Sequence, residues 1–277
     1  MIRLVTITST VLMLAVLALR ASAQEFGFAV YNADRLYDTL PSPFYDDSDY
    51  TPEGRLAWNT ERYRRKVAQT AAVLDSMAMP VVALCGVENE TVVRDIVSMC
   101  GCDYSYVHRT IDSFDGMDFA LLYFGDLLFP SRVEKGMRHL TVEATVMGHK
   151  FAFIICNRAR NLDDIVAELR AETPDIHIVV AGDLRDTGFR RLGFSDATER
   201  AAKSGAGNAL FRSGWVMADR FAVDGSLRAE GVVYGRRWML DRDGAPAATY
   251  EGTRYRGGAG RRLPVCGAIK IGFFHFE

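Results

Sequence analysis

Apolar residues recur at helical spacing in three segments of the chain. In residues 61–79 they come every three or four positions, which places them on one face of a helix: Tyr63, Val67, Ala71, Leu74 and Met77. Pro80 follows and is expected to end this helix, because proline cannot continue one. Residues 91–99 and 162–173 show similar spacing, so the sequence predicts helices there as well.

Shorter apolar runs predict strands. They occupy residues 26–31, 81–87, 119–124, 140–146, 150–156, 176–181, 215–223, the region near 231–238, and 265–276. Two of these runs flank Met147-Gly148-His149, which indicates a hairpin. Because helices separate some strands while others pair as hairpins, we expect an α/β sandwich of two sheets with outer helices. A chain of 277 residues that is 49% apolar suits one large domain.

Residues 1–23 have the pattern of a secretory signal peptide. Arg3 gives a short basic start, residues 4–19 are mostly apolar, and Ala21-Ser22-Ala23 is a small-residue cleavage site. The alternative, an uncleaved anchor, requires a longer apolar run and a stop-transfer flank. We therefore expect an exported domain of residues 24–277, periplasmic or secreted, with no transmembrane segment after cleavage.

The formal net charge of the chain argues against one class of partner, nucleic acids. The formal net charge is −2, and cleavage before Gln24 removes Arg3 and Arg20 and leaves −4. A nucleic-acid-binding protein that relies on bulk charge needs a basic excess. The sequence therefore carries no strong nucleic-acid footprint.

The five cysteines carry little functional information. Cys85, Cys156 and Cys266 lie in apolar strand-like runs and are expected to be buried thiols. One glycine separates Cys100 from Cys102, a spacing that strains a mutual disulfide. Neither the spacing of a Cys–His zinc site nor a CxxC motif is present, and the disulfide state stays open.

Seven separated segments match, in order, the motifs of one family. They are residues 31–38 (YNADRLYD), 51–63 (TPEGRLAWNTERY), 84–89 (LCGVEN), 116–123 (GMDFALLY), 182–186 (GDLRD), 215–223 (WVMADRFAV) and 249–265 (TYEGTRYRGGAGRRLPV). Each match is weak alone, but together they span nearly all of the chain after residue 23. On these motifs the chain resembles the endonuclease/exonuclease/phosphatase superfamily, in its exported bacterial form.

The resemblance implies a fold and a chemistry. The fold is a four-layer α/β sandwich, with two mixed β-sheets packed face to face and the site where strand-end loops meet. Members hydrolyse phosphodiesters or phosphomonoesters of nucleic acids, phosphoinositides or sphingolipids. In the family pattern a Glu holds magnesium, Asp and Asn of GDFND orient the nucleophile and the phosphate, and a His–Asp pair handles protons.

The chain departs from the family at most of these positions. Gly86 replaces the magnesium-holding Glu, and Val216 replaces the Asn of WNM. Arginines replace the histidine of NHW, the Asn of GDFND, and the Asp and His of SDH: Arg158, Arg185, Arg261 and Arg262. The residues that match the family are Asn32, Asp118, Asp183 and Asp219.

These departures predict that magnesium, the family cofactor, is not retained. Magnesium prefers carboxylate oxygens in an octahedral shell, whereas Gly86 and Arg261 offer none and arginine repels the cation. Glu88 is a weak candidate ligand, because residues i and i+2 of a strand share a face. It lies about 6.5 Å further along the strand, too far for a ligand unless the strand slips.

The arginines support two interpretations. Arg158, Arg185, Arg261 and Arg262 come from three loops that the fold is expected to bring together, and four guanidinium groups suit a phosphate-like anion. Alternatively, they are ordinary surface charges left after catalysis was lost. Two ion pairs are expected, Arg262 with Asp219 and Asp183 with Arg185 or Arg261. Asn32 either binds phosphate or only holds its own turn.

Three functions are therefore open. The first is a catalytically degenerate phosphoesterase-fold protein that binds a phosphate-like anion or a protein partner through an arginine-lined cleft. The second is an active phosphoesterase or nuclease with a rearranged site, which uses Asp183 with Glu88 or works without metal. The family-matched catalytic residues left to it are Asn32, Asp183 and Asp219. The third is a structural interaction module in which the old cleft has no role.

Overall fold

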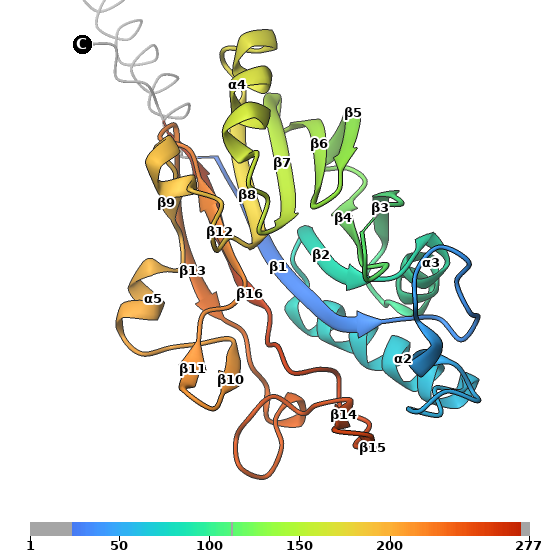
Figure 1. The fold of residues 1–277 in the computed structure, drawn as a ribbon. Coiled ribbons are helices and arrows are strands. Elements are labelled where there is room, and N and C mark those ends of the chain that lie inside the picture. Colours follow the sequence, from blue (N-terminus) through green and yellow to red (C-terminus); the bar gives the residue numbers. More distant parts are fainter. Residues whose placement is uncertain (1–23, 112, 273–277) are drawn as a thin grey trace, which may run out of the picture.

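Two six-stranded sheets pack face to face in the computed structural model, which describes residues 24–111 and 113–272 (Figure 1). The first sheet has the order β13 (Leu227–Val233), β16 (Val265–Ile271), β1 (Glu25–Leu36), β2 (Val81–Val87), β4 (Asp118–Phe124) and β3 (Tyr104–Arg109). The second has the order β5 (Leu128–Gly136), β6 (His139–Val146), β7 (His149–Asn157), β8 (His177–Asp183), β12 (Arg220–Val223) and β9 (Ser195–Asp196).

Both sheets are mixed. β1 runs parallel to β2, and β7 runs parallel to β8, while the other strand pairs are antiparallel. The core between the sheets is built on aromatic rings: Phe28 of the first sheet stacks on Phe153 of the second at 5.9 Å and lies 5.2 Å from Phe221. The expected α/β sandwich is confirmed.

Helices cover the outer faces. The α-helices are α2 (Thr60–Met77), α3 (Glu90–Met99), α4 (Leu162–Glu172) and the short α5 (Glu199–Lys203). The 3-10 turns are η1 (Ser48–Tyr50), η2 (Phe189–Leu192) and η3 (Arg237–Met239). α2 and α3 pack on the first sheet, and α4 packs on the second. The side chains of Asn59 and Asn89 accept the backbone N–H groups of Arg62 and Val92 and so cap α2 and α3.

Three predicted strands differ from their expected bounds. The strand predicted over residues 265–276 ends at Ile271, and residues 273–276 lie outside the described part of the chain. Residues 215–223 form two strands, β11 (Gly214–Val216) and β12, because Asn208 Oδ1 accepts the N–H groups of Ala218 and Asp219 and takes them out of any ladder. β11 pairs with β10 (Ala209–Phe211) as a separate hairpin. The strand near 231–238 ends at Val233, after which Tyr234 N–H bonds to Pro264 O.

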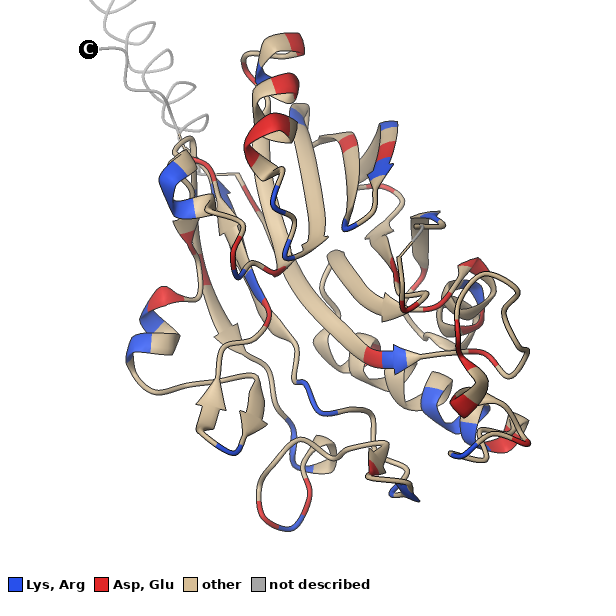
Figure 2. Cartoon of the chain, in the orientation of Figure 1, with Lys and Arg blue, Asp and Glu red and all other residues tan. Residues whose placement is uncertain are grey.

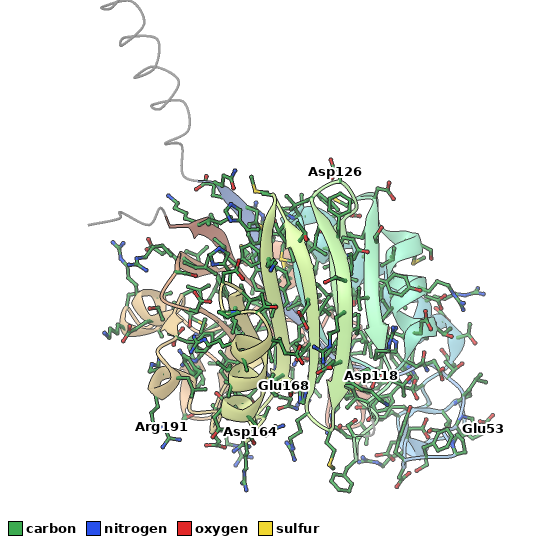
Figure 3. All side chains as sticks on the ribbon, turned by 90° about the horizontal axis from the view of Figure 1, so that it is seen from above. Glu53, Asp118, Asp126, Asp164, Glu168 and Arg191 are labelled. Carbon is green, nitrogen blue, oxygen red and sulfur yellow. The ribbon has the colours of Figure 1, made fainter. Side chains whose placement is uncertain are left out.

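The predicted chemistry lies at one end of the sandwich. Figure 3 shows Asp118 and Asp126 at opposite ends of the sheet that contains β4. Since β1, β2 and β8 end on the Asp118 side, the loops that follow them meet there. The same end carries the β10–β11 hairpin and a second small hairpin, β14 (Tyr250–Glu251) with β15 (Arg254–Tyr255) (Figure 1).

The predicted signal peptide, residues 1–23, lies outside the described residues. Within residues 24–111 and 113–272, no helix has the length and apolar character needed to cross a membrane. The three cysteines predicted to be buried are buried, and all five cysteines are free thiols.

Candidate functional site

A cavity of about 230 Å³ opens at the end of the sandwich where the strand-end loops meet. The residues of its lining that matter for chemistry are Asn32, Asp34, Gly86, Asp183, Arg261 and Arg262. They come from β1, β2, β8 and the loop before β16. The structure therefore brings together Asn32, Gly86, Asp183 and Arg262 as the sequence predicted, and Asp219 lies directly behind Arg262.

Asp219 and Arg262 form the predicted ion pair. Nη1 of Arg262 donates to Oδ1 of Asp219 at 2.6 Å, and the two side chains are 22% and 1% exposed. Asn208 Nδ2 donates to the other oxygen of Asp219 at 2.9 Å. Burial raises the pKa of Asp219, while the neighbouring Arg262 acts in the opposite direction.

Asn208 was not predicted as a site residue. It is fully buried, and besides Asp219 its amide nitrogen bonds to Leu263 O at 3.0 Å. Its carbonyl oxygen accepts the N–H of Ala218 at 2.7 Å. The local sequence, residues 205–211 (GAGNALF), does not indicate this role, because the hydrogen-bond partners of Asn208 lie 10 and 55 residues away.

Asp183 is held by the arginine two residues after it. Arg185 donates from Nε to Oδ1 at 2.8 Å and from Nη2 to Oδ2, so the contact is bidentate. The carboxylate is 7% exposed, whereas half of the arginine side chain faces solvent. The family-matched aspartate therefore has both oxygens occupied.

Asp34 is a second residue that the sequence analysis did not single out. Its Oδ2 accepts the backbone N–H of Arg261 at 2.9 Å and Nε of Arg261 at 3.3 Å. Its backbone oxygen accepts Nζ of the fully buried Lys66 at 2.7 Å. Burial alone would raise the pKa of Asp34, but Lys66 and Arg261 together lower it. Burial in turn lowers the pKa of Lys66 to about 8.

Gly86 has a backbone conformation that disfavours a side chain at this position. Its φ is +72°, in the left-handed region that glycine adopts readily. A Cβ at this position would lie 2.6 Å from Oδ1 of Asn32. Asn32 Oδ1 in turn accepts the N–H of Asp34 at 2.9 Å, so Asn32 holds its own turn.

Glu88 does not reach the cavity. Its side chain is 3% exposed and accepts the N–H of Asp38 at 2.5 Å and the Tyr45 hydroxyl at 2.7 Å. Burial raises the pKa of Glu88 to about 7. The carboxylate thus fastens the loop after β1 to the end of β2.

The four predicted arginines do not form one basin. Arg261 and Arg262 line the cavity, whereas Arg158 and Arg185 do not. Arg158 turns to Asp186, with Nε 3.0 Å from Oδ2. Each of the four guanidinium groups therefore has an aspartate partner.

Asp118 also has a structural environment. Its Oδ2 lies 2.8 Å from Nε2 of His108, and its Oδ1 accepts the N–H of Ile111 at 2.7 Å. Both side chains of the pair are buried. This carboxylate therefore ties β4 to β3 and the loop that follows it.

The donor set does not fit magnesium. The carboxylates that line the cavity are those of Asp34, Asp115 and Asp183, and Asp219 lies behind Arg262. An arginine contacts each of the four. Across residues 24–111 and 113–272, no group of three or more His, Cys, Asp or Glu side chains is placed to hold a metal ion. A cation here would meet guanidinium groups before it met a free oxygen.

Residues 27–149 match the Endonuclease/Exonuclease/phosphatase family. They run from β1 to the first residue of β7 and include Asn32, Gly86 and Asp118. No curated protein sequence matches the chain.

Solved structures share the fold at low identity. One is an endonuclease/exonuclease/phosphatase family protein from Bacteroides thetaiotaomicron, with a TM-score of 0.60 and 13% identity over 91% of this chain and all of that one (100%). A mannosyl-6-phosphatase from the same organism has a TM-score of 0.59 and 13% identity over 88% and 99% of the two chains. A humanized D. rerio TDP2 has a TM-score of 0.56 and 14% identity over 88% of this chain and 98% of that one. At this identity the likeness concerns the fold.

Proposed function

We propose that the chain is a catalytically degenerate member of the endonuclease/exonuclease/phosphatase superfamily, since residues 27–149 match that family and the fold is similar to that of a solved family protein. It binds a phosphate-like anion in the old catalytic cleft and does not hydrolyse it. The observation that carries this proposal is that an arginine neutralises each carboxylate nearest the cleft.

Loss of hydrolysis follows from the chemistry of these pairs. Arg262 stands where the family has a histidine, and a guanidinium group with a pKa above about 12 cannot accept a proton near neutral pH. Asp183 has both oxygens bound to Arg185 and cannot orient a nucleophile without breaking a bidentate contact. Among the described residues, each carboxylate of the cavity lining is paired with an arginine, so none is free to replace the one that Gly86 lacks.

Anion binding depends on the N–H groups that are not already used in the ion pairs. Arg262 uses one nitrogen for Asp219, and Arg261 is 68% exposed at the rim. Guanidinium groups have five N–H donors, and Asn32 has an amide nitrogen besides the oxygen that holds its turn. The cavity lining contains three arginines and three aspartates, so a small oxyanion is favoured by directed hydrogen bonds rather than by excess charge.

The rival function, an active enzyme that uses Asp183 with Glu88, lacks a supporting contact. Glu88 binds Asp38 and Tyr45 and lies outside the cavity. Both carboxylates would have to leave their partners to meet a common ion.

We also propose that the protein is exported after cleavage of residues 1–23. The basic start, apolar run and small-residue cleavage site support this. Mass spectrometry of the protein from its native cells should find Gln24 at the N-terminus. An intact N-terminal methionine on the mature protein would contradict export by this route.

Two measurements test the cleft. Turnover of p-nitrophenyl phosphate and bis-p-nitrophenyl phosphate is followed with and without magnesium, with Asp183→Asn as the matched control. We expect no magnesium-dependent turnover, and turnover that Asp183→Asn abolishes would establish the active enzyme. Inorganic phosphate should raise the melting temperature of the native protein but not that of the Arg261→Ala, Arg262→Ala double variant. If phosphate changes the melting temperature of neither protein, anion binding in the cleft is excluded, and the structural interaction module is the function that is left.

A further inference from the structure

A second, larger cavity of about 1380 Å³ lies beside the cleft and shares Arg261 with it. Its walls come from α2, the β10–β11 hairpin, the loop after η3 and the β14–β15 hairpin. Figure 2 shows basic segments on each of these elements, with acidic segments on the loop after η3. We refer to this cavity as the arginine groove.

The arginines of the groove differ from those of the cleft. They are Arg65, Arg212, Arg242, Arg254, Arg256 and Arg261. Arg256 pairs with Glu251, and Arg261 pairs with Asp34. The other four are exposed and make no ion pair within the part of the chain that the structure describes. Four guanidinium groups without an ion pair therefore line the groove, whereas each guanidinium group at a family-matched position is paired with an aspartate.

Charge and aromatic surface occur together in this groove. Six arginines face three carboxylates, those of Asp241, Asp243 and Glu251, in a chain whose net charge is −2. Trp238 is 49% exposed on one wall, and the half-buried Tyr250 lies on another. An exposed indole beside free guanidinium groups is a surface suited to a ligand that has both rings and anionic groups.

The carboxylates decide which ring-bearing anion fits. The phosphodiester backbone of DNA has no hydroxyl group, so the three carboxylates of the groove would meet its negative charge without a donor to bind. Sugar hydroxyl groups are donors, and carboxylates accept hydrogen bonds from them. Arginine forks bind carboxylate, sulfate and phosphate substituents in a bidentate way.

We propose that the arginine groove binds an acidic oligosaccharide. Arg212 and Arg254 bind its anionic substituents from opposite hairpins, Trp238 packs against a sugar ring, and the groove carboxylates accept from hydroxyl groups. This goes beyond the function of the cleft and does not depend on it, because none of the four free arginines lines the cleft.

Binding to the full-length protein is measured by calorimetry with four probes. Hexagalacturonate and a heparin-derived hexasaccharide supply carboxylate and sulfate substituents. Maltohexaose is the uncharged glycan, and single-stranded oligothymidylate is the nucleic acid. We expect one or both acidic glycans to bind at least about tenfold more tightly than maltohexaose and oligothymidylate, and which of them binds identifies the substituent.

The variants locate the site. Arg212→Ala with Arg254→Ala should weaken binding of the acidic glycan by about tenfold or more, and Trp238→Ala should also weaken it. The matched control is Arg64→Ala with Arg94→Ala, which removes the same charge from exposed positions outside the groove and should leave affinity unchanged. Arg262→Ala separates the two sites, since Arg262 lines the cleft and not the groove; its melting temperature is measured alongside, because the variant unpairs the buried Asp219.

Four results would overturn the proposal. They are no binding of either acidic glycan, equal binding of maltohexaose, equal loss in the Arg64, Arg94 control, and tighter binding of oligothymidylate that the groove variants abolish. The last result would assign the groove to nucleic acid. If Arg262→Ala loses phosphate binding and keeps glycan binding, the two sites are separate. This proposal then stands whether or not the cleft binds phosphate in the native protein.

Discussion

Asn208 connects three segments that are distant in sequence. Its side chain binds Asp219 and the backbone of residues 218 and 263, and its own backbone oxygen accepts the N–H of Leu263 at 2.7 Å. Asp219 consequently has one oxygen fixed by Asn208 and the other by Arg262. The carboxylate that orients a histidine in the family now completes a buried structural network.

The stability of this network can be measured. Arg262→Ala leaves Asp219 buried with an unpaired charge, and we expect it to lower the free energy of unfolding by about 3 kcal/mol. Urea denaturation at neutral pH gives the value. The double variant Arg262→Ala, Asp219→Asn buries no charge and should recover part of the loss. A single variant as stable as the native protein would show that the pair is superficial.

Glu88 gives the protein a specific dependence on pH. Its folded pKa of about 7 lies above the ordinary value of 4.5, because burial disfavours the charged carboxylate. Between these two values the folded state binds more protons than the unfolded state, so stability falls as pH rises through this window.

The matched variant is Glu88→Gln, whose amide does not titrate but can still accept from Asp38 N–H and donate to the Tyr45 hydroxyl. Urea denaturation at pH values from below 4.5 to above 7 should show a steeper decline for the native protein than for the variant. Parallel curves would remove Glu88 as the cause.

At the scale of elements, the β6–β7 hairpin shows how a turn fixes a register. Met147 and Gly148 have φ values of +50° and +85°. This is the conformation of a two-residue hairpin turn with positive φ at both positions, for which Asn-Gly is favoured. Register then runs unbroken from Val146–His149 to His139–Cys156.

The turn supports a paired prediction. No atom lies within 4 Å of the position where a Cβ at Gly148 would be, so Gly148→Ala tests φ alone and should cost about 1 kcal/mol. Met147→Asn should stabilise by a few tenths of a kcal/mol, since asparagine tolerates left-handed backbone. Thermal and urea denaturation give both values. A cost for Met147→Asn would mean that the Met147 side chain contributes packing.

Helices and strands were predictable where the local sequence pattern determines their bounds. The strand at Val81–Val87 is confirmed in full, and the expected helices lie within two residues of their predicted ends, because their periodicity and caps are local. β3 and β5 were missed, since their exposed positions break the apolar run. The break within residues 215–223 depends on Asn208, a partner that no local signal identifies.

At the scale of the whole molecule, the ordered motifs predicted which segments meet, and the cavity confirms it. They did not predict the partners of the arginines. Arg261 binds Asp34, which lies 227 residues away, and Arg158 binds Asp186 outside the cavity. Such pairs depend on side-chain directions at loop ends, which the sequence pattern does not contain.

Magnesium should leave the stability of the whole protein unchanged. A ligand that binds only the folded state stabilises it by RT ln(1 + [L]/Kd) and so raises the melting temperature. We expect no rise with millimolar magnesium chloride beyond that seen with potassium chloride at equal ionic strength. A magnesium-specific rise that Asp183→Asn removes would contradict the interpretation of the paired carboxylates.

The backbone at Gly86 opposes a carboxylate side chain at this position. Glutamate there would have to adopt φ near +72° and would place its Cβ 2.6 Å from the Asn32 oxygen that holds the neighbouring turn. Gly86→Glu alone is therefore expected to destabilise the fold. Asn32 and the turn after it would need to change first. Local geometry thus constrains the order in which substitutions at residues 32 and 86 can be accepted.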